Sequence, residues 1–125
     1  MGEMRAIGSH PDGHPWEVGM ADPDVAGRNK STLPIVDRAV STSGAYGFRF
    51  DPDARFNHLL DPHTGGCAHR YKSVTTVSRS ATAADALSTA FSLMPETQIR
   101  AVLPRVDIER VYGVDGTASV FELAA

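Results

Sequence analysis

Short stretches in which apolar and polar side chains alternate occur along much of the chain, and a period of two residues predicts β-strands. Residues 16–20 alternate in this way and predict a short strand with one buried face. Residues 33–40 form an apolar run that predicts a second strand, which the small polar residues 41–44 should end. The polar segment 22–30 is expected to be a surface loop. Further short strands are expected at residues 46–50, 56–60 and 73–78.

One segment has the period of an α-helix instead. Its apolar residues between positions 84 and 94 recur every three or four positions and form a single stripe. Ser80 or Thr82 is suited to cap the start of this helix. Pro95 either ends the helix or opens a second one that continues through residues 101–103.

The end of the chain has the pattern of a β-hairpin. Residues 108–112 and 118–123 flank Asp115 and Gly116, a pair that is typical of a two-residue turn. The expected strands outnumber the helices and cluster in hairpins. The pattern therefore predicts an α+β fold, an antiparallel sheet with one or two helices packed on one face, and we expect residues 1–125 to form one domain.

Composition narrows the range of functions. The chain has 125 residues and a net charge of −3, and it has no cluster of lysine and arginine, which argues against nucleic acid as a partner. No apolar run approaches the roughly 20 residues that a bilayer requires. Residues 1–10 lack the apolar segment of a secretory signal, so we expect a cytoplasmic protein. Cys67 is the only cysteine, which rules out an internal disulfide.

The first group of residues with chemical potential lies on the expected helix. Asp85, Ser88 and Thr89 fall on one narrow face beside the apolar stripe, because a helix has about 3.6 residues per turn. A carboxylate and two hydroxyls are oxygen ligands of the kind that suits Mg²⁺. On spacing alone, an ordinary polar flank with an acid near the helix start explains the same residues.

The second group surrounds a turn rich in proline and glycine. His58 lies at the end of an expected strand and is followed by Asp61, Thr64 and two glycines. A histidine in such a place can act as an acid or a base near neutral pH. The simpler alternative is that His58 fills a strand edge while Asp61 and Thr64 form hydrogen bonds within the turn.

The same segment offers a zinc site as a third interpretation. Imidazole, carboxylate and thiolate groups all bind Zn²⁺, although the spacing here matches no familiar zinc motif. The residues concerned are His58, Asp61, His63, Cys67 and His69. Elsewhere, His10 and His14 flank a Pro/Gly turn and are expected to be solvated, and Trp16 is expected in the core.

Taken in order, these segments resemble the C-terminal part of the ApbE family, the FAD:protein FMN transferases. Two strings carry most of the resemblance: His-x-x-Asp-Pro-x-Thr-Gly at residues 58–65 and Ala-Asp-Ala-Leu-Ser-Thr-Ala at residues 84–90. The resemblance extends over nearly the whole chain. Shorter matches occur at residues 2–8, 11–16, 43–46 and 73–75.

The resemblance implies an activity. Members of the family bind FAD and Mg²⁺ and transfer FMN to a threonine hydroxyl of a target flavoprotein, releasing AMP. Some members instead hydrolyse FAD to FMN and AMP. The implied partners of this chain are therefore FAD and an acceptor flavoprotein that carries the target threonine.

The resemblance also implies roles for particular residues. Asp85 and Thr89 match the side-chain metal ligands of the family, and Ser88 is a weaker match. His58 matches the histidine near the reacting phosphate, which is proposed to handle the proton of the acceptor. Leu60 matches a position whose backbone contacts the flavin. The positions expected to shape the flavin pocket are Ser43, Asp61 and Thr64.

The chain also departs from the family pattern. It opens inside the Gly-Gly-x-x-Arg region of the family, and it contains no upstream Lys-Gly-Tyr-Ala motif. We therefore expect a fold that is truncated at the N-terminus and an activity that is impaired in this short chain. Two alternatives stay open. The first is a non-catalytic module for FAD binding or assembly, paired with another copy or with a complementary N-terminal chain. The second is an FAD diphosphatase.

Overall fold

The structure is a computed structural model that describes residues 2–45, 53 and 56–125. Five strands form one antiparallel sheet in the order β1-β4-β5-β6-β7, and a separate two-stranded ribbon pairs β2 with β3. The sheet consists of β1 (Gly2–Arg5), β4 (Ala39–Gly44), β5 (Tyr71–Ser78), β6 (Arg110–Asp115) and β7 (Val120–Ala124). The other elements are β2 (Trp16–Ala21), β3 (Asn29–Ile35), α1 (Ala81–Phe91), α2 (Glu96–Val102) and a short 3₁₀ helix (Leu103–Arg105).

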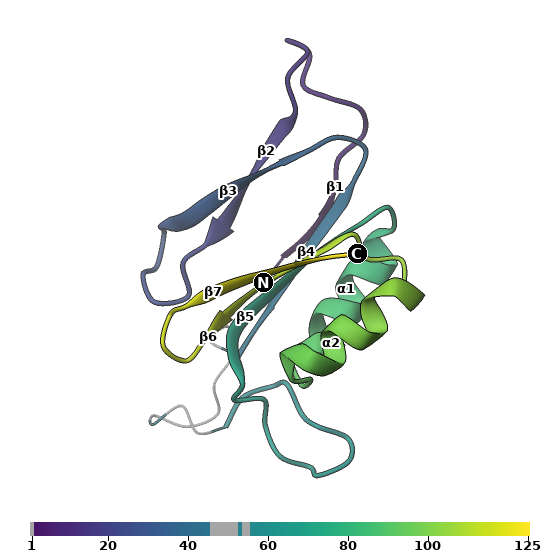
Figure 1. Cartoon of the computed structure of the whole chain (residues 1–125). Helices are drawn as coiled ribbons and strands as arrows, with labels where there is room; N and C mark the ends of the chain where they lie inside the picture. The colour runs from purple at the N-terminus through teal and green to yellow at the C-terminus, as the bar shows by residue number, and fades with distance from the viewer. Residues whose placement is uncertain (1, 46–52, 54–55) are drawn as a thin grey trace.

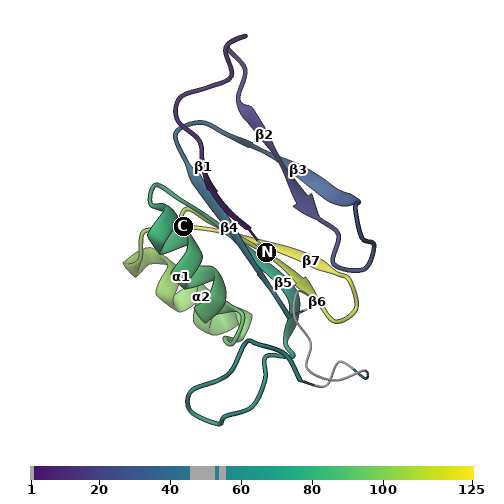
Figure 2. The ribbon, with the colours of Figure 1, turned by 180° about the vertical axis from the view of Figure 1, so that it is seen from behind.

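The helices and the ribbon cover opposite faces of the sheet. Figure 1 shows α1 and α2 packed side by side on one face, and Figure 2 shows the β2–β3 ribbon leaning over the other. The predicted α+β fold, an antiparallel sheet with two helices on one face, is thereby confirmed. In the described part of the chain, no helix is long and apolar enough to cross a membrane.

The side chains of the central strand β5 alternate between the two faces of the sheet, and each face has its own apolar core. Val74 belongs to the core under the helices, whereas Val77 belongs to the core under the ribbon, because successive side chains of a strand point to opposite sides. The helix-side core consists of Tyr71, Val74, Phe91, Ile99, Leu103, Ile108, Val111 and Leu123. The ribbon-side core consists of Val18, Leu33, Ile35, Val40 and Val77. A strand that is covered on both faces is buried over nearly its whole length, as β5 is.

Local sequence accounts for both ends of the helical segment. The hydroxyl of Ser80 accepts a hydrogen bond from the backbone N–H of Ala83 at 3.2 Å, so Ser80 is the cap, and not Thr82. Pro95 is the N-cap of α2, which confirms the alternative in which it opens a second helix. The hydroxyl of Thr76 donates to the carbonyl of Ala84 at 2.7 Å and fastens α1 to β5.

Several predictions for the first half of the chain were wrong. Residues 33–40 do not form one strand, because β3 ends at Ile35 and Asp37 adopts a positive φ of 50° before β4 begins in the other sheet. Residues 41–44 continue β4 rather than ending a strand, and the side chains of Ser41 and Ser43 lie buried under α1. Trp16 is 37% exposed at the rim of the ribbon instead of lying in the core. The strand expected at residues 46–50 lies outside the described residues.

Two further predictions require correction. Residues 56–60 form no strand, and Leu60 pairs with Cys67 in an isolated bridge. In the C-terminal hairpin the two strands are confirmed but the turn is longer than two residues, because the N–H of Asp115 donates to the carbonyl of Ser119. Ala118 has a φ of 64°, which is typical of a three-residue loop. The hydroxyl and N–H of Thr117 lower the pKa of Asp115.

Candidate functional site

A cluster of hydroxyl side chains lies where α1 packs on β4. Ser43 Oγ is 2.8 Å from Ser88 Oγ and 2.9 Å from Thr89 Oγ1. Ser41 Oγ lies 3.4 Å from Ser88 Oγ. Hydroxyls both donate and accept, so the cluster satisfies its own hydrogen bonds away from water. The cluster therefore fixes how α1 is rotated against the sheet.

The cluster leaves one side of α1 open for a ligand. Asp85 lies one turn before Thr89 and is exposed, and no described residue pairs with its carboxylate. Thr89 is half-buried. An uncommitted carboxylate and a hydroxyl one helical turn apart are oxygen donors of the kind that Mg²⁺ takes. The residues present at this position fit a hard divalent cation.

Ser88, the third member of the predicted set, has a different environment. It is fully buried, and its hydroxyl donates to the carbonyl of Asp85 at 3.0 Å besides contacting Ser43. Ser43 is also fully buried, so the structure groups it with the helix residues rather than with the turn that holds Asp61. Both serines thus lie between β4 and α1 and help to fix the position of the helix.

Asn57 holds the segment that carries His58. Its Nδ2 donates to the carbonyl of Ala68 at 2.8 Å, and its Oδ1 accepts from the N–H of Leu59 at 2.9 Å. Asn57 and Leu59 are buried, so the backbone on both sides of the half-buried His58 is fixed. The sequence analysis missed Asn57. The sequence did hold a signal, because an asparagine comes directly before the histidine. The side chain of asparagine often forms a hydrogen bond with the backbone two residues further along the chain.

The turn after His58 is closed by its own side chains. The carboxylate of Asp61 accepts from the N–H of His63 at 2.8 Å, and the hydroxyl of Thr64 accepts from the N–H of Gly66 at 3.1 Å. The hydrogen bond from the backbone of His63, together with its nearby ring, lowers the pKa of Asp61. The turn role that the simpler alternative gave to Asp61 and Thr64 is confirmed, while Leu60 is 57% exposed.

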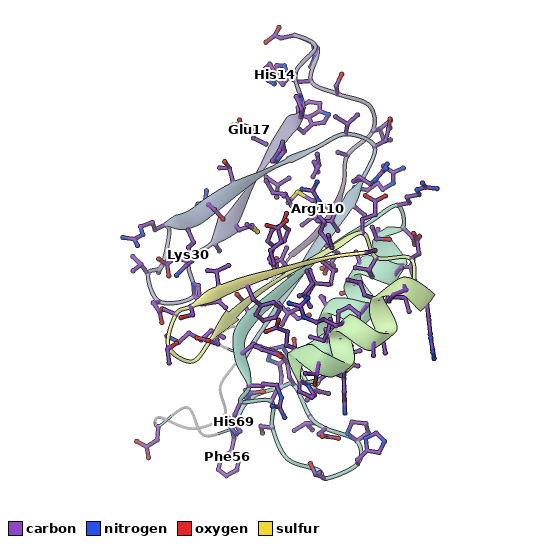
Figure 3. The ribbon with its side chains drawn as sticks, viewed as in Figure 1. His14, Glu17, Lys30, Phe56, His69 and Arg110 are labelled. Carbon is purple, nitrogen blue, oxygen red and sulfur yellow. The ribbon has the colours of Figure 1, made fainter. Side chains whose placement is uncertain are left out.

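A cavity of about 370 Å³ joins this turn to the C-terminal end of α1. Asp61 and Thr64 line one side, and Ser92 and Leu93 line the other. Figure 3 shows His69, another lining residue, beside this end of the sheet near Phe56. Ser92 lies one turn after Ser88 and donates to its carbonyl at 2.8 Å. The hydroxyl cluster and the cavity therefore occupy successive turns of one helix.

The zinc interpretation of the His58 segment is not supported. His63 Nδ1 lies 3.3 Å from Asp61 Oδ1, but Cys67 Sγ accepts instead from the backbone N–H of Asn57. Among residues 2–45, 53 and 56–125, the three-residue group of potential metal ligands lies elsewhere, at His10, Asp12 and His14.

The buried position of Ser88 gives a first prediction. Ser88→Val is expected to lower the free energy of unfolding by about 2–3 kcal/mol, because the larger side chain overpacks the contact with β4 and leaves Ser43 short of a partner. Chemical denaturation measures the loss. Ser88→Ala, the matched control, loses the hydrogen bonds without overpacking and should cost about 1 kcal/mol. An equal loss of unfolding free energy in the two variants would contradict close packing of Ser88 against β4.

Comparison with known proteins places this arrangement in a family. A model of the ApbE family matches residues 1–112. An FAD:protein FMN transferase of Vibrio cholerae serotype O1 is 36% identical over 104 residues, which cover 81% of this chain and 31% of that protein.

Solved structures agree with this match. The crystal structure of the ApbE protein of Thermotoga maritima superposes with a TM-score of 0.85 at 31% identity, covering 96% of this chain and 40% of that one. The flavinyl transferase ApbE of Pseudomonas stutzeri superposes with a TM-score of 0.70 at 33% identity, covering 99% of this chain and 39% of that one. The chain thus spans 31% to 40% of the length of these relatives. Since the family match extends over most of its residues, the chain belongs to the ApbE family.

Proposed function

We propose that this chain carries the cation-binding part of a Mg²⁺-dependent FAD:protein FMN transferase, which moves FMN from FAD to a threonine hydroxyl of a target flavoprotein. The observation that carries the proposal is the carboxylate of Asp85, which pairs with none of the residues that the structure describes and lies one turn from Thr89 on a helix fixed by buried hydroxyls. The names of the relatives support flavin transfer as the activity.

The proposed reaction is a phosphoryl transfer. The threonine oxygen of the acceptor bonds to the phosphorus of the FMN half, the bond from that phosphorus to the AMP oxygen breaks, and AMP leaves. When bound, Mg²⁺ neutralises the diphosphate and stabilises the oxygen of the leaving AMP. In this proposal Asp85 and Thr89 hold the cation, and the ring of His58 takes the proton of the attacking hydroxyl.

The distribution of charge supports a requirement for a cation. Lys30 donates to the carbonyl of Ala118, and Lys72 pairs with Asp24, so both lysines of the chain are engaged away from α1. Arg70 lines the cavity, but α1 has no basic residue in its last turn. The C-terminal end of a helix carries partial negative charge, which repels a bare diphosphate. We infer that a divalent cation adds to the positive charge of Arg70.

The cavity supports the proposal through its position. It lies one helical turn beyond the hydroxyl cluster, so a ligand that reaches from Thr89 to Ser92 enters it. A volume of about 370 Å³ is at the small end of the range for ligand pockets and suits one part of a dinucleotide. In the proposal, Asp61, Thr64 and the backbone of Leu60 shape the flavin end of the site.

A labelling assay tests the role of His58. The chain is incubated with FAD, Mg²⁺ and an acceptor that carries the target threonine, and the mass gain of FMN on the acceptor is measured. His58→Ala is expected to slow transfer by about 10²–10⁴-fold, the usual contribution of a positioned base. His63→Ala is the matched control, because its ring is 91% exposed. Equal rates in the two variants would contradict the assignment.

The same assay separates the alternatives. Release of AMP without labelling of the acceptor supports an FAD diphosphatase. Absence of turnover, together with a stable oligomer in light scattering, supports an assembly module.

One observation favours the assembly module as a second function. The edge strand β1 pairs only with β4 in the described part of the sheet, and its residues are exposed. Beside it lies a mostly apolar groove of about 470 Å³ lined by Met4, Ile7 and Trp16. An open edge next to apolar side chains is the geometry that accepts an added strand. We propose a complementary N-terminal chain as the occupant, with another copy of this chain as the alternative.

A further inference from the structure

We propose that the loop between β1 and β2 binds a divalent transition-metal ion, represented here by Zn²⁺, through His10, Asp12 and His14. One ligand atom from each of these residues lies within 4.8 Å of the other two. Figure 3 shows His14 at the opposite end of the molecule from Phe56 and His69. The site is therefore separate from the flavin site proposed above and does not depend on it.

Backbone hydrogen bonds hold the loop in a closed turn. The N–H of His10 donates to the carbonyl of His14 at 2.9 Å, and the N–H of Gly13 donates to the carbonyl of His10 at 2.8 Å. Gly13 has a φ of 90°, a conformation that glycine adopts at little cost. The three ligand residues thus occupy every second position of a turn that is already formed. Less conformational entropy is lost on binding as a result.

The distances suit chelation. Asp12 Oδ2 lies 3.3 Å from His10 Nδ1 and 3.8 Å from His14 Nε2. Two ligand atoms that are each about 2.0–2.2 Å from a tetrahedral zinc ion stand roughly 3.3–3.6 Å apart. The carboxylate already lies at this distance from His10, and the His14 ring has to turn out of its stack on His10 to complete the triangle.

The hydrogen bonds of the two rings are compatible with an acceptor nitrogen in each ring facing Asp12. His14 Nδ1 lies 2.9 Å from the carbonyl of Pro15, which can only accept, so in the neutral ring Nδ1 carries the proton and Nε2 is a base. The N–H of Asp12 donates to His10 Nδ1 at 3.2 Å, so this nitrogen is also a base. A carbonyl on the far nitrogen is the common outer partner of a metal-binding histidine.

With both rings neutral, these contacts bring three electron-pair donors together. A cation at their centre replaces the repulsion between the donors with attraction, and it displaces the long hydrogen bond to His10. Two imidazoles and one carboxylate favour Zn²⁺ and its neighbours over Mg²⁺, which prefers an all-oxygen environment. With three protein ligands, a fourth position stays open for water.

The chain contains a built-in reporter of this site. The rings of His10 and Trp16 are in edge contact, with centroids 5.0 Å apart, and Trp16 is the only tryptophan. The rings of His10 and His14 stack at 4.3 Å, and binding one ion between them requires these rings to tilt apart. Metal binding therefore changes the surroundings of Trp16, and its fluorescence responds to this loop.

Titration of the full chain with zinc chloride, followed by tryptophan fluorescence above the usual titration range of imidazole, tests the proposal. We expect a saturable change that a chelator reverses, and no such change with magnesium chloride. Asp12→Asn and His14→Gln should each weaken the apparent affinity for zinc at least about tenfold. His63→Gln, which removes an exposed histidine beside Asp61, is the matched control and should leave the affinity unchanged.

Two results would overturn the proposal. One is the absence of a saturable response in the unmodified chain. The other is a zinc affinity that is the same in Asp12→Asn and His14→Gln as in the unmodified chain, or that falls equally in His63→Gln. Because these side chains are exposed, we expect their substitution to leave the fold intact. FAD binding does not enter the readout, so failure here is distinguishable from failure of the proposed function.

Discussion

Asp85→Ala is expected to reduce FMN transfer by about 10²–10³-fold. A metal ion that polarises a phosphoryl group contributes several kcal/mol of transition-state stabilisation, and each 1.4 kcal/mol corresponds to a factor of ten in rate. Removal of the carboxylate leaves Thr89 as the side-chain ligand that the structure offers on this helix face. The measurement is the rate of mass gain on the acceptor at saturating Mg²⁺.

The control for this variant is Asp107→Ala, which removes another exposed carboxylate that is not on α1. It changes the net charge equally and should leave the transfer rate unchanged. Asp85 is exposed, so its substitution should also leave the free energy of unfolding nearly unchanged. If Asp85→Ala transferred FMN at the rate of the unmodified chain, the assignment of a cation to this position would be contradicted.

Phe91→Ala is expected to lower the free energy of unfolding by about 3–5 kcal/mol, the range for truncating a buried phenylalanine. Phe91 is the last residue of α1, is 1% exposed and lies in the core between the helices and the sheet. Its removal leaves a cavity where α1 is anchored. Urea denaturation, followed by circular dichroism, measures the loss.

Phe56→Ala is the matched control for this substitution, because Phe56 is 52% exposed. It should cost about 1 kcal/mol or less. Equal destabilisation by the two variants would show that α1 is not anchored through the helix-side core.

Sequence patterns predicted the elements that are determined locally. The stripe on α1 was correct because Ala84 and Phe91 repeat at helical spacing and are both buried. The turn at residues 61–66 was correct because aspartate, threonine and glycine close it with bonds to neighbouring residues. In these segments, propensity, periodicity and tertiary packing all favour the same structure.

The failures occurred where residues far apart in sequence decide the structure. Ser41 and Ser43 suggested a break, yet they are buried because Ser88 supplies hydroxyl partners 45 and more residues later. Hydropathy also gave no sign that residues 33–40 divide between two sheets, since Ile35 and Val40 are apolar members of the same core.

The same limit applies to what the sequence could predict of the candidate site. Helical spacing grouped Asp85, Ser88 and Thr89, but it could not say which of them packs on β4 and which faces solvent. That division depends on the rotation of α1, which a partner strand determines. Spacing likewise did not show that a closed turn brings His10 and His14 together.

The affinity of the chain for FAD, measured by calorimetry with and without Mg²⁺, tests the central claim most directly. The claim is that Asp85 and Thr89 hold a cation on which the diphosphate docks. We predict that Mg²⁺ tightens FAD binding at least about tenfold in the unmodified chain, equivalent to about 1.4 kcal/mol, and has no effect in Asp85→Ala. The same FAD affinity in both solutions for the unmodified chain would contradict the claim.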